Sequence, residues 1–291
     1  TLQGRSDPAM GVRGWRELMR ATAVMTTVPA EPRAMVPLET LKQVLAVLAT
    51  SERFSDKQLH LVILVLLFTF SRTECPCPKA WTGPNAFDSN QHWQVADFKL
   101  RPSADGGKSW VLWVRFKRIK QDARVERASM VHADTFVPTE LTGDGGFGRD
   151  WVPLGDVPTV DEACGLPIFS VAAAYKRFVK AVGRARSGDE PMFLNKDKSR
   201  YYTYSCLLTD FHEAFAEFLI SYIKSLGPHG LRVLGYNLSK AGNGEDLTVA
   251  HGGWMSTAHS RYHRWGLPDV LNVPARMLGV DAPFAAARPV T

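Results

Sequence analysis

The feature of this sequence that most constrains its fold is a run of twelve residues from Leu59 to Phe70, in which His60 is the only ionisable side chain. A helix that crosses a membrane needs roughly 20 apolar residues, so this run is too short to span a bilayer. It therefore predicts a helix that is buried on all sides in a protein core. The chain has 291 residues, of which 45% are hydrophobic, and this is enough for one large domain, or for one domain and a fragment of a second.

Apolar residues at helical spacing predict several more helices around this one. We expect the buried helix to start near Asp56 and to run to Phe70, where the stretch that contains Pro76 and Pro78 stops it, because proline cannot continue a helix. The other predicted helices cover residues 15–25, 38–48, 171–182, 207–223, 229–240, 245–250 and 256–263.

Two runs of strand-forming residues, 93–100 and 110–120, predict a β-hairpin, because a loop with two adjacent glycines separates them. A third strand is expected at residues 134–138 or at residues 150–153. The glycine-rich stretch 143–148 lacks the strand-to-helix context of a phosphate-binding loop, and we interpret it as a flexible loop. The expected fold class is α+β, mainly helical, with a small antiparallel sheet.

The positive charge of the chain is concentrated around the predicted hairpin. The formal net charge of the whole chain is +6, whereas residues 108–127 alone hold seven basic and two acidic side chains, a net charge of +5. Such a segment attracts polyanions, and if the partner is double-stranded DNA, Arg115, Lys117, Arg118 and Arg124 would bind it. Charge alone, however, favours a solvated hairpin with its basic residues on one face.

The cysteines indicate a reducing compartment. Cys75 and Cys77 are too close in sequence to form a disulfide easily, and neither these two nor Cys164 and Cys206 show the paired spacing of a zinc site. The N-terminal residues also lack the pattern of a signal peptide. We expect free thiols in a protein without membrane attachment, nuclear if the host is eukaryotic and cytoplasmic otherwise.

His229 and Arg232 lie three residues apart at the start of a predicted helix. Residues at this spacing share a helix face, so an imidazole donor and a permanent cation can bind one anion together, and phosphate is the obvious candidate. If the phosphate belongs to DNA and a strand is cut without a metal, a side-chain hydroxyl must attack phosphorus while fixed cations offset the charge. Tyrosine suits this chemistry, because its phenolate is both a nucleophile and a good leaving group.

Four motifs in order along the chain resemble those of the tyrosine recombinases, the phage integrase family, and especially those of eukaryotic DIRS-like and Crypton-like mobile elements. In that family an arginine ends an apolar helix, a lysine lies in the β-hairpin that follows, and a His-x-x-Arg motif begins a later helix. A His or Trp then lies shortly before the tyrosine. The matching residues are Arg72 in LFTFSRTECP, Lys120 in FKRIKQD, His229 and Arg232 in HGLR, and Trp254 and Tyr262 in GGWMSTAHSRY.

The closing motif is the most specific of the four. In the mobile-element branch it often reads Gly-x-Trp-x-Ser-x-Ala followed by Tyr. It is matched here by Gly252, Trp254, Ser256, Ala258 and Tyr262. The resemblance covers residues 37–262 and implies a recombinase catalytic domain over residues 37–291. Residues 1–36 would be a linker and a remnant of the N-terminal core-binding domain of that family.

The resemblance also implies a role for each matching residue. Arg72 and Arg232 would hold the scissile phosphate, and Lys120 would protonate the leaving 5′-oxygen. His229 would assist proton transfer, and Trp254 would support the site by packing or through its indole N–H.

The implied function is site-specific cleavage and rejoining of DNA, in which Tyr262 forms a 3′-phosphotyrosyl bond. This chemistry needs neither a metal ion nor a nucleotide cofactor. Four protomers would act together on DNA, and the free protein would be a monomer or a weak oligomer.

Two positions of the pattern leave alternatives. Many relatives have an acidic residue three after the first arginine, whereas here Glu74 is two after Arg72 and Cys75 holds the usual place. Lys117 and Arg118 are near rivals of Lys120, because the register of a hairpin is hard to fix from sequence.

The remaining histidines of this region also have two interpretations. His251 lies eleven residues before Tyr262 and is a reserve candidate for the role given to Trp254. His259 and His263 have the spacing of two metal ligands on a helix, but no glutamate follows His259 as it does in a zinc protease. We expect these histidines to surround a phosphate or to lie at the surface, and we expect no metal site.

Two other functions are compatible with the same motifs. A catalytically inert protein derived from a recombinase would bind DNA without cutting it, because loss of the N-terminal domain would weaken the clamp around DNA. A type IB topoisomerase shares the chemistry but relaxes supercoils as a monomer.

Overall fold

The computed structural model describes residues 35–103, 109–115, 151–218, 226–251 and 270–281. The chain divides into two compact units, Thr1–Arg33 and Ala34–Thr291, and all of the described residues belong to the second unit. The domain remnant expected over residues 1–36 lies almost entirely outside them and stays a prediction.

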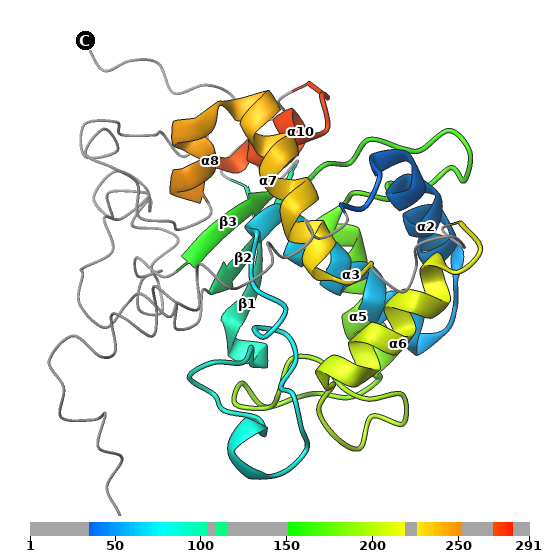
Figure 1. The fold of residues 1–291 in the computed structure, drawn as a ribbon, viewed down its shortest axis with the longest axis vertical. Helices are drawn as coiled ribbons and strands as arrows, with labels where there is room; N and C mark the ends of the chain where they lie inside the picture. Colours follow the sequence, from blue (N-terminus) through cyan, green and yellow to red (C-terminus); the bar gives the residue numbers. More distant parts are fainter. Residues whose placement is uncertain (1–34, 104–108, 116–150, 219–225, 252–269, 282–291) are drawn as a thin grey trace, which may run out of the picture. The chain divides into compact units, whose positions relative to one another are not determined.

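Helices and one small antiparallel sheet make up the described fold, which confirms the predicted class, α+β and mainly helical (Figure 1). The α-helices are α2 (Leu38–Thr50), α3 (Phe54–Thr69), α5 (Val171–Val182), α6 (Tyr204–Phe215), α7 (His229–Asn243), α8 (Glu245–His251) and α10 (Val273–Met277). The strands are β1 (Phe98–Pro102), β2 (Trp110–Arg115) and β3 (Trp151–Gly155), and two short 3-10 helices are η2 (Gly83–Asn85) and η3 (Val95–Asp97). None of the described helices is long and apolar enough to cross a membrane.

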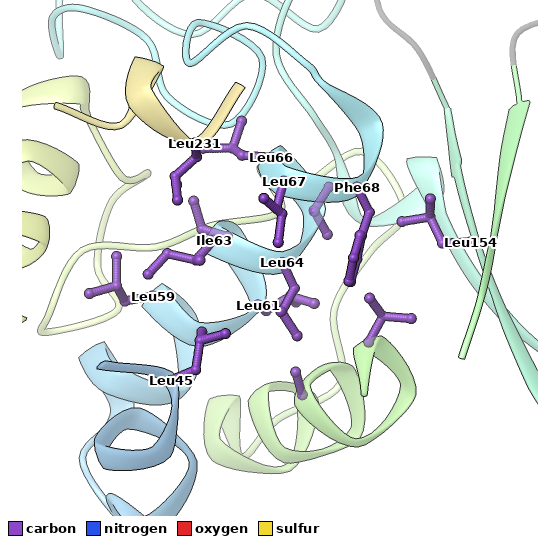
Figure 2. Packing of buried hydrophobic residues seen from close by; sticks show 14 of the residues in the cluster. Leu45, Leu59, Leu61, Ile63, Leu64, Leu66, Leu67, Phe68, Leu154 and Leu231 are labelled. Carbon is purple, nitrogen blue, oxygen red and sulfur yellow. The ribbon is translucent and has the colours of Figure 1, made fainter. Parts of the chain in front are cut away.

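Helix α3 lies at the centre of the core, as its apolar run predicts. From Gln58 to the end of the helix every side chain is buried, and α3 packs against α2, α5, α6, α7 and β3. Figure 2 shows its side chains pointing outward around the helix axis, among Leu45 of α2, Leu231 of α7 and Leu154 of β3. Full burial of such a side chain contributes about 1.5–3 kcal/mol, so a helix that is apolar on every face is most stable at the centre.

Two polar side chains of α3 are buried with hydrogen-bond partners outside the helix. Gln58 donates to the carbonyl oxygen of Leu194 at 2.7 Å and accepts from the N–H of the same residue at 2.8 Å. His60 Nε2 lies 2.7 Å from the carbonyl oxygen of Ile168, and because a carbonyl only accepts, this nitrogen carries the proton. Burial lowers the pKa of His60 to about 4, so its imidazole is neutral at neutral pH.

Helix α3 ends at Thr69, one residue before the predicted end at Phe70, but the prediction that prolines stop it is wrong. Phe70 adopts a left-handed backbone conformation, with φ of 51°, and its side chain is only 1% exposed. The hydroxyl of Thr69 donates to the carbonyl oxygen of Val65 at 2.6 Å. Since a left-handed residue cannot continue a right-handed helix, Phe70 stops α3 before the chain reaches Pro76 and Pro78.

The three strands form one antiparallel sheet in the order β1-β2-β3, which confirms the predicted hairpin. Lys99 of β1 pairs with Trp113 of β2, and Trp113 pairs with Pro153 of β3. The third strand therefore lies at the second of the two expected places, and the alternative at 134–138 lies outside the described residues.

The strand that we expected from residue 93 begins only at Phe98. Gln94 and Asp97 form a reciprocal capping box that holds the intervening residues in η3. A 3-10 turn has no extended backbone, so this local hydrogen bonding overrides the strand propensity of the segment.

Among the helices after the sheet, α5 has the predicted bounds, because Ser170 caps its start and Gly183 ends it with a φ of 77°. Helix α6 ends at Phe215, well before the predicted residue 223. Helices α7 and α8 start where expected, whereas α10, which packs on α7 and β3, was not predicted. The helices expected at 15–25 and 256–263 lie outside the described residues.

Candidate functional site

Arg72 follows the end of α3 on a short and tightly bonded turn. The N–H of Cys75 donates to the carbonyl oxygen of Arg72 at 2.9 Å, and the N–H of Trp93 donates to that of Cys75 at 2.9 Å. Ser71 and Cys77 are buried, whereas Arg72 is exposed. The backbone is therefore fixed on both sides, while the guanidinium of Arg72 remains at the surface.

His229 and Arg232 occupy the first turn of α7, as the His-x-x-Arg spacing predicts. The helix begins with a hydrogen bond of 2.8 Å from the N–H of Gly230 to the carbonyl oxygen of Gly227. Leu231 is fully buried, and the side chains of His229 and Arg232 are half-buried. The N-terminus of a long helix carries a partial positive charge, which adds to that of Arg232.

Arg72 and Arg232, far apart in the sequence, come together beside Cys75. Burial and the positive charge of Arg72 lower the pKa of Arg232 below its ordinary value. Both guanidinium charges also act on the thiol of Cys75. The fold therefore brings two cations close enough for their charges to interact, and an anion near both would be stabilised.

Cys75 stands where many tyrosine recombinases have an acidic residue. Burial raises the pKa of its thiol to about 11, so the side chain is uncharged at neutral pH. The neighbouring Glu74 forms an ion pair with Lys79, with Oε1 and Nζ 3.0 Å apart. A carboxylate engaged by a lysine offsets the positive charge of Arg72 and Arg232 less than a free one would.

Gly235 allows α7 to lie directly against α3. A Cβ atom at this position would overlap the carbonyl oxygen of Leu67 and would lie 2.9 Å from Cδ1 of Phe70. Figure 1 shows α7 lying across α3, with which it is in contact. Since Arg232 is one helical turn before Gly235, this close approach sets how near Arg232 comes to the end of α3. Gly235 was not predicted from the sequence, in which its only signal is a glycine inside a helix, one turn after the motif arginine.

His251, the reserve candidate, is the last residue of α8 and is 1% exposed. Its Nε2 lies 2.7 Å from the carbonyl oxygen of Phe68, and its ring meets the ring of Phe70 edge-on, with centroids 5.5 Å apart. Burial lowers the pKa of His251 to about 4. The structure thus places this histidine against the end of α3, next to the turn that carries Arg72.

The structure brings together Arg72, Arg232 and the helix start that carries His229. The other predicted site residues lie outside the described residues, so their roles stay predictions: Lys120, Trp254, Tyr262, Lys117, Arg118 and Arg124. Arg115, predicted to contact DNA, ends β2 with its side chain 48% exposed and with Nη1 3.8 Å from Oδ1 of Asp97.

The four cysteines are present as free thiols. Within the described part of the chain, no group of three or more His, Cys, Asp or Glu side chains could hold a metal ion.

No protein-family model matches the sequence, and no curated protein sequence matches it. Among solved structures, the chain is similar to an FLP recombinase–Holliday junction complex, with a TM-score of 0.41 and 10% sequence identity. The similarity covers 92% of this chain and 57% of that chain, so this chain spans little more than half of the recombinase.

Proposed function

We propose that this protein cleaves and rejoins DNA at specific sites through a 3′-phosphotyrosyl intermediate, in the manner of a tyrosine recombinase. The observation that carries the proposal is the meeting of Arg72 and Arg232 beside the start of α7. Two guanidinium groups held together repel each other, and a phosphodiester placed against both relieves this repulsion while it accepts hydrogen bonds from each. In the proposed site the two arginines bind the non-bridging oxygens of one phosphate.

In this proposal Tyr262 Oη attacks the phosphorus of a phosphodiester held by Arg72 and Arg232. The Oη–P bond forms, the bond from phosphorus to the 5′-oxygen breaks, and the strand stays attached through its 3′-phosphate. The phenolic proton passes to His229, and Lys120 supplies a proton to the leaving 5′-oxygen. The arginines offset the negative charge that grows on the non-bridging oxygens. Rejoining is the reverse, with a 5′-hydroxyl as the nucleophile.

The partners of the proposed reaction follow from the same motifs. The basic segment 108–127 supplies sequence-independent contacts to the backbone of double-stranded DNA. Trp254 supports the site beside the nucleophile. Four protomers act on two DNA sites, as in a mobile-element recombinase of a eukaryotic nucleus, and the free protein is at most a weak oligomer.

The proposal is tested by covalent trapping on a nicked suicide substrate, from which the cleaved fragment diffuses away so that rejoining fails. We expect an attached DNA fragment on the wild-type protein, mapped by mass spectrometry to Tyr262, and none on Tyr262→Phe, which should bind duplex DNA nearly as well as the wild type. Tyr204→Phe, which removes a hydroxyl from α6, is the matched control and should attach DNA normally. Duplex binding without any wild-type adduct would instead support the inert DNA-binding protein.

A further inference from the structure

His251 joins two parts of the chain that are 183 residues apart. Its Nε2–H donates to the carbonyl oxygen of Phe68 at 2.7 Å, and both groups are buried. Since a carbonyl can only accept, the imidazole carries its proton on Nε2 and leaves Nδ1 bare. Among the described residues Nδ1 of His251 has no hydrogen-bond partner.

The carbonyl group that His251 binds lies at the end of α3. The last four carbonyl groups of a helix lack a partner within it, and a buried one left unpaired is destabilising. Because α3 ends at Thr69, the carbonyl of Phe68 belongs to this set. His251 therefore caps the C-terminal end of α3 from another helix.

The same end of α3 is held from a second side. The ring of Phe70 contacts His251 of α8 and also lies where a side chain at Gly235 of α7 would be. Phe70 and Ser71 are buried, and Arg72 is the first exposed residue after them. The left-handed turn that delivers Arg72 to the surface is thus clamped between α7 and α8, two residues before the guanidinium.

We propose that His251 is a positioning residue, which touches no DNA but fixes the end of α3 and so the direction in which Arg72 meets the phosphate. The inference rests on the proposed function for its catalytic consequence, although the clamp itself does not depend on it. A rigid placement of Arg72 matters because a shift of about 1 Å in a positioning group can lower a rate on the order of 100-fold.

The chain offers a close control for this proposal. His60 also donates from a buried imidazole Nε2 to a carbonyl oxygen at 2.7 Å, but near the start of α3 and away from Arg72. His251→Asn and His60→Asn each remove one such bond, because the side chain of Asn is too short to place a donor at the Nε2 position. His251→Gln can place its amide N–H there and serves as the conservative rescue.

The first measurement is the rate of covalent attachment to the nicked substrate, at a temperature at which every variant is folded. We expect His251→Asn to lower the rate about tenfold or more without changing duplex affinity, and His251→Gln to recover most of it. His60→Asn should lower the melting temperature comparably while it keeps the wild-type rate. In an Arg72→Ala background His251→Asn should have no further effect, because it acts through Arg72.

The second measurement does not depend on DNA cleavage. Trypsin cuts after Arg72 once the turn opens, and Arg200, an exposed loop residue, is the internal reference site. We expect the ratio of cleavage after Arg72 to cleavage after Arg200 to rise in His251→Asn but not in His60→Asn or His251→Gln. If the wild type forms no adduct but this ratio rises as stated, the proposed function fails and the clamp stands. Two results would overturn the positioning role. One is a cleavage ratio that His251→Asn leaves unchanged. The other is a loss of attachment on His251→Asn that is as large in the Arg72→Ala background as in the wild type.

Discussion

Gly235 on α7 lies so close to the carbonyl oxygen of Leu67 on α3 that a β-carbon would overlap that oxygen. Gly242, two turns further along α7, approaches the carbonyl oxygen of Arg276 just as closely. Helix α7 is therefore held at its middle and near its C-terminal end by direct contact with the backbone of neighbouring segments. Only the first contact bears on the site, because Gly235 is one turn from Arg232.

We expect Gly235→Ala and Gly242→Ala each to destabilise the fold by about 1–3 kcal/mol, since overpacking outweighs the gain of up to about 1 kcal/mol in helix propensity. Urea unfolding measures both effects. Gly235→Ala should also weaken duplex binding and covalent attachment, because it moves α7 away from the end of α3, whereas Gly242→Ala should leave both unchanged. Equal losses of attachment in the two variants would show that the Gly235 contact does not position Arg232.

The stability of the fold should fall in mild acid. Burial lowers the pKa values of His60 and His251 to about 4 from their ordinary value of 6.5. Below pH 6.5 the unfolded chain therefore binds protons that the folded protein does not, so folding is disfavoured progressively down to about pH 4. Between pH 7 and pH 5 the loss should be about 2 kcal/mol for each histidine.

The measurement is the free energy of unfolding in urea at pH 7 and at pH 5. Replacing either histidine by Gln should roughly halve the difference. The groups nearest the two imidazoles differ, because Arg177 lies 3.5 Å from Nδ1 of His60 while Phe70 packs against His251. The positive charge of Arg177 further lowers the pKa of His60. Equal stability at the two pH values would contradict the buried, neutral state of both side chains.

Lys120 is expected to act only on the leaving group. Lys120→Ala should attach DNA slowly with an ordinary substrate and normally with a 5′-thiolate leaving group, which needs no proton. Lys117→Ala is the matched control: it should weaken duplex binding, but at saturating DNA it should attach both substrates at the wild-type rate. If instead Lys117→Ala is the variant rescued by the thiolate, the role belongs to Lys117.

The basic segment should set the salt dependence of DNA binding. Neutralising Lys117, Arg118 and Arg124 together should reduce the slope of log affinity against log salt by up to about 2.7, if each contacts one phosphate. A control variant neutralises three lysines that form ion pairs with acidic side chains elsewhere, namely Lys42, Lys57 and Lys240. A slope that the first variant leaves unchanged would place the DNA surface elsewhere.

Local signals predicted the parts of the fold that depend on neighbours in sequence. The unbroken apolar run made α3 a central helix, and Ser170 and Gly183 mark both ends of α5. The end of α3 was predicted to within one residue, but the left-handed residue that stops it was not, because Phe70 is not a residue type that favours a left-handed backbone and is stabilised there by burial. The capping box of η3 was overlooked in a segment that otherwise resembles a strand.

The candidate site stays a prediction. Motif spacing selected Arg72 and Arg232, and the structure places them close enough for the charge of Arg72 to lower the pKa of Arg232. The contacts that hold them there could not be read from the sequence, because they join residues distant along the chain. His251 donates a hydrogen bond to the carbonyl oxygen of Phe68, and Gly235 lies against the carbonyl oxygen of Leu67.

The central claim is that Arg72 and Arg232 act on the same phosphate, and a double-mutant cycle on the rate of covalent attachment tests it most directly. We expect Arg72→Ala and Arg232→Ala each to lower the rate on the order of 100-fold, as removal of a preorganised charge does. The rate of the double variant should fall by much less than the product of the two single reductions. The reason is that each arginine stabilises the charge of a phosphate that the other helps to position, so the second loss costs less once the first has occurred. Losses that simply multiply, or a wild-type rate in either single variant, would contradict the account.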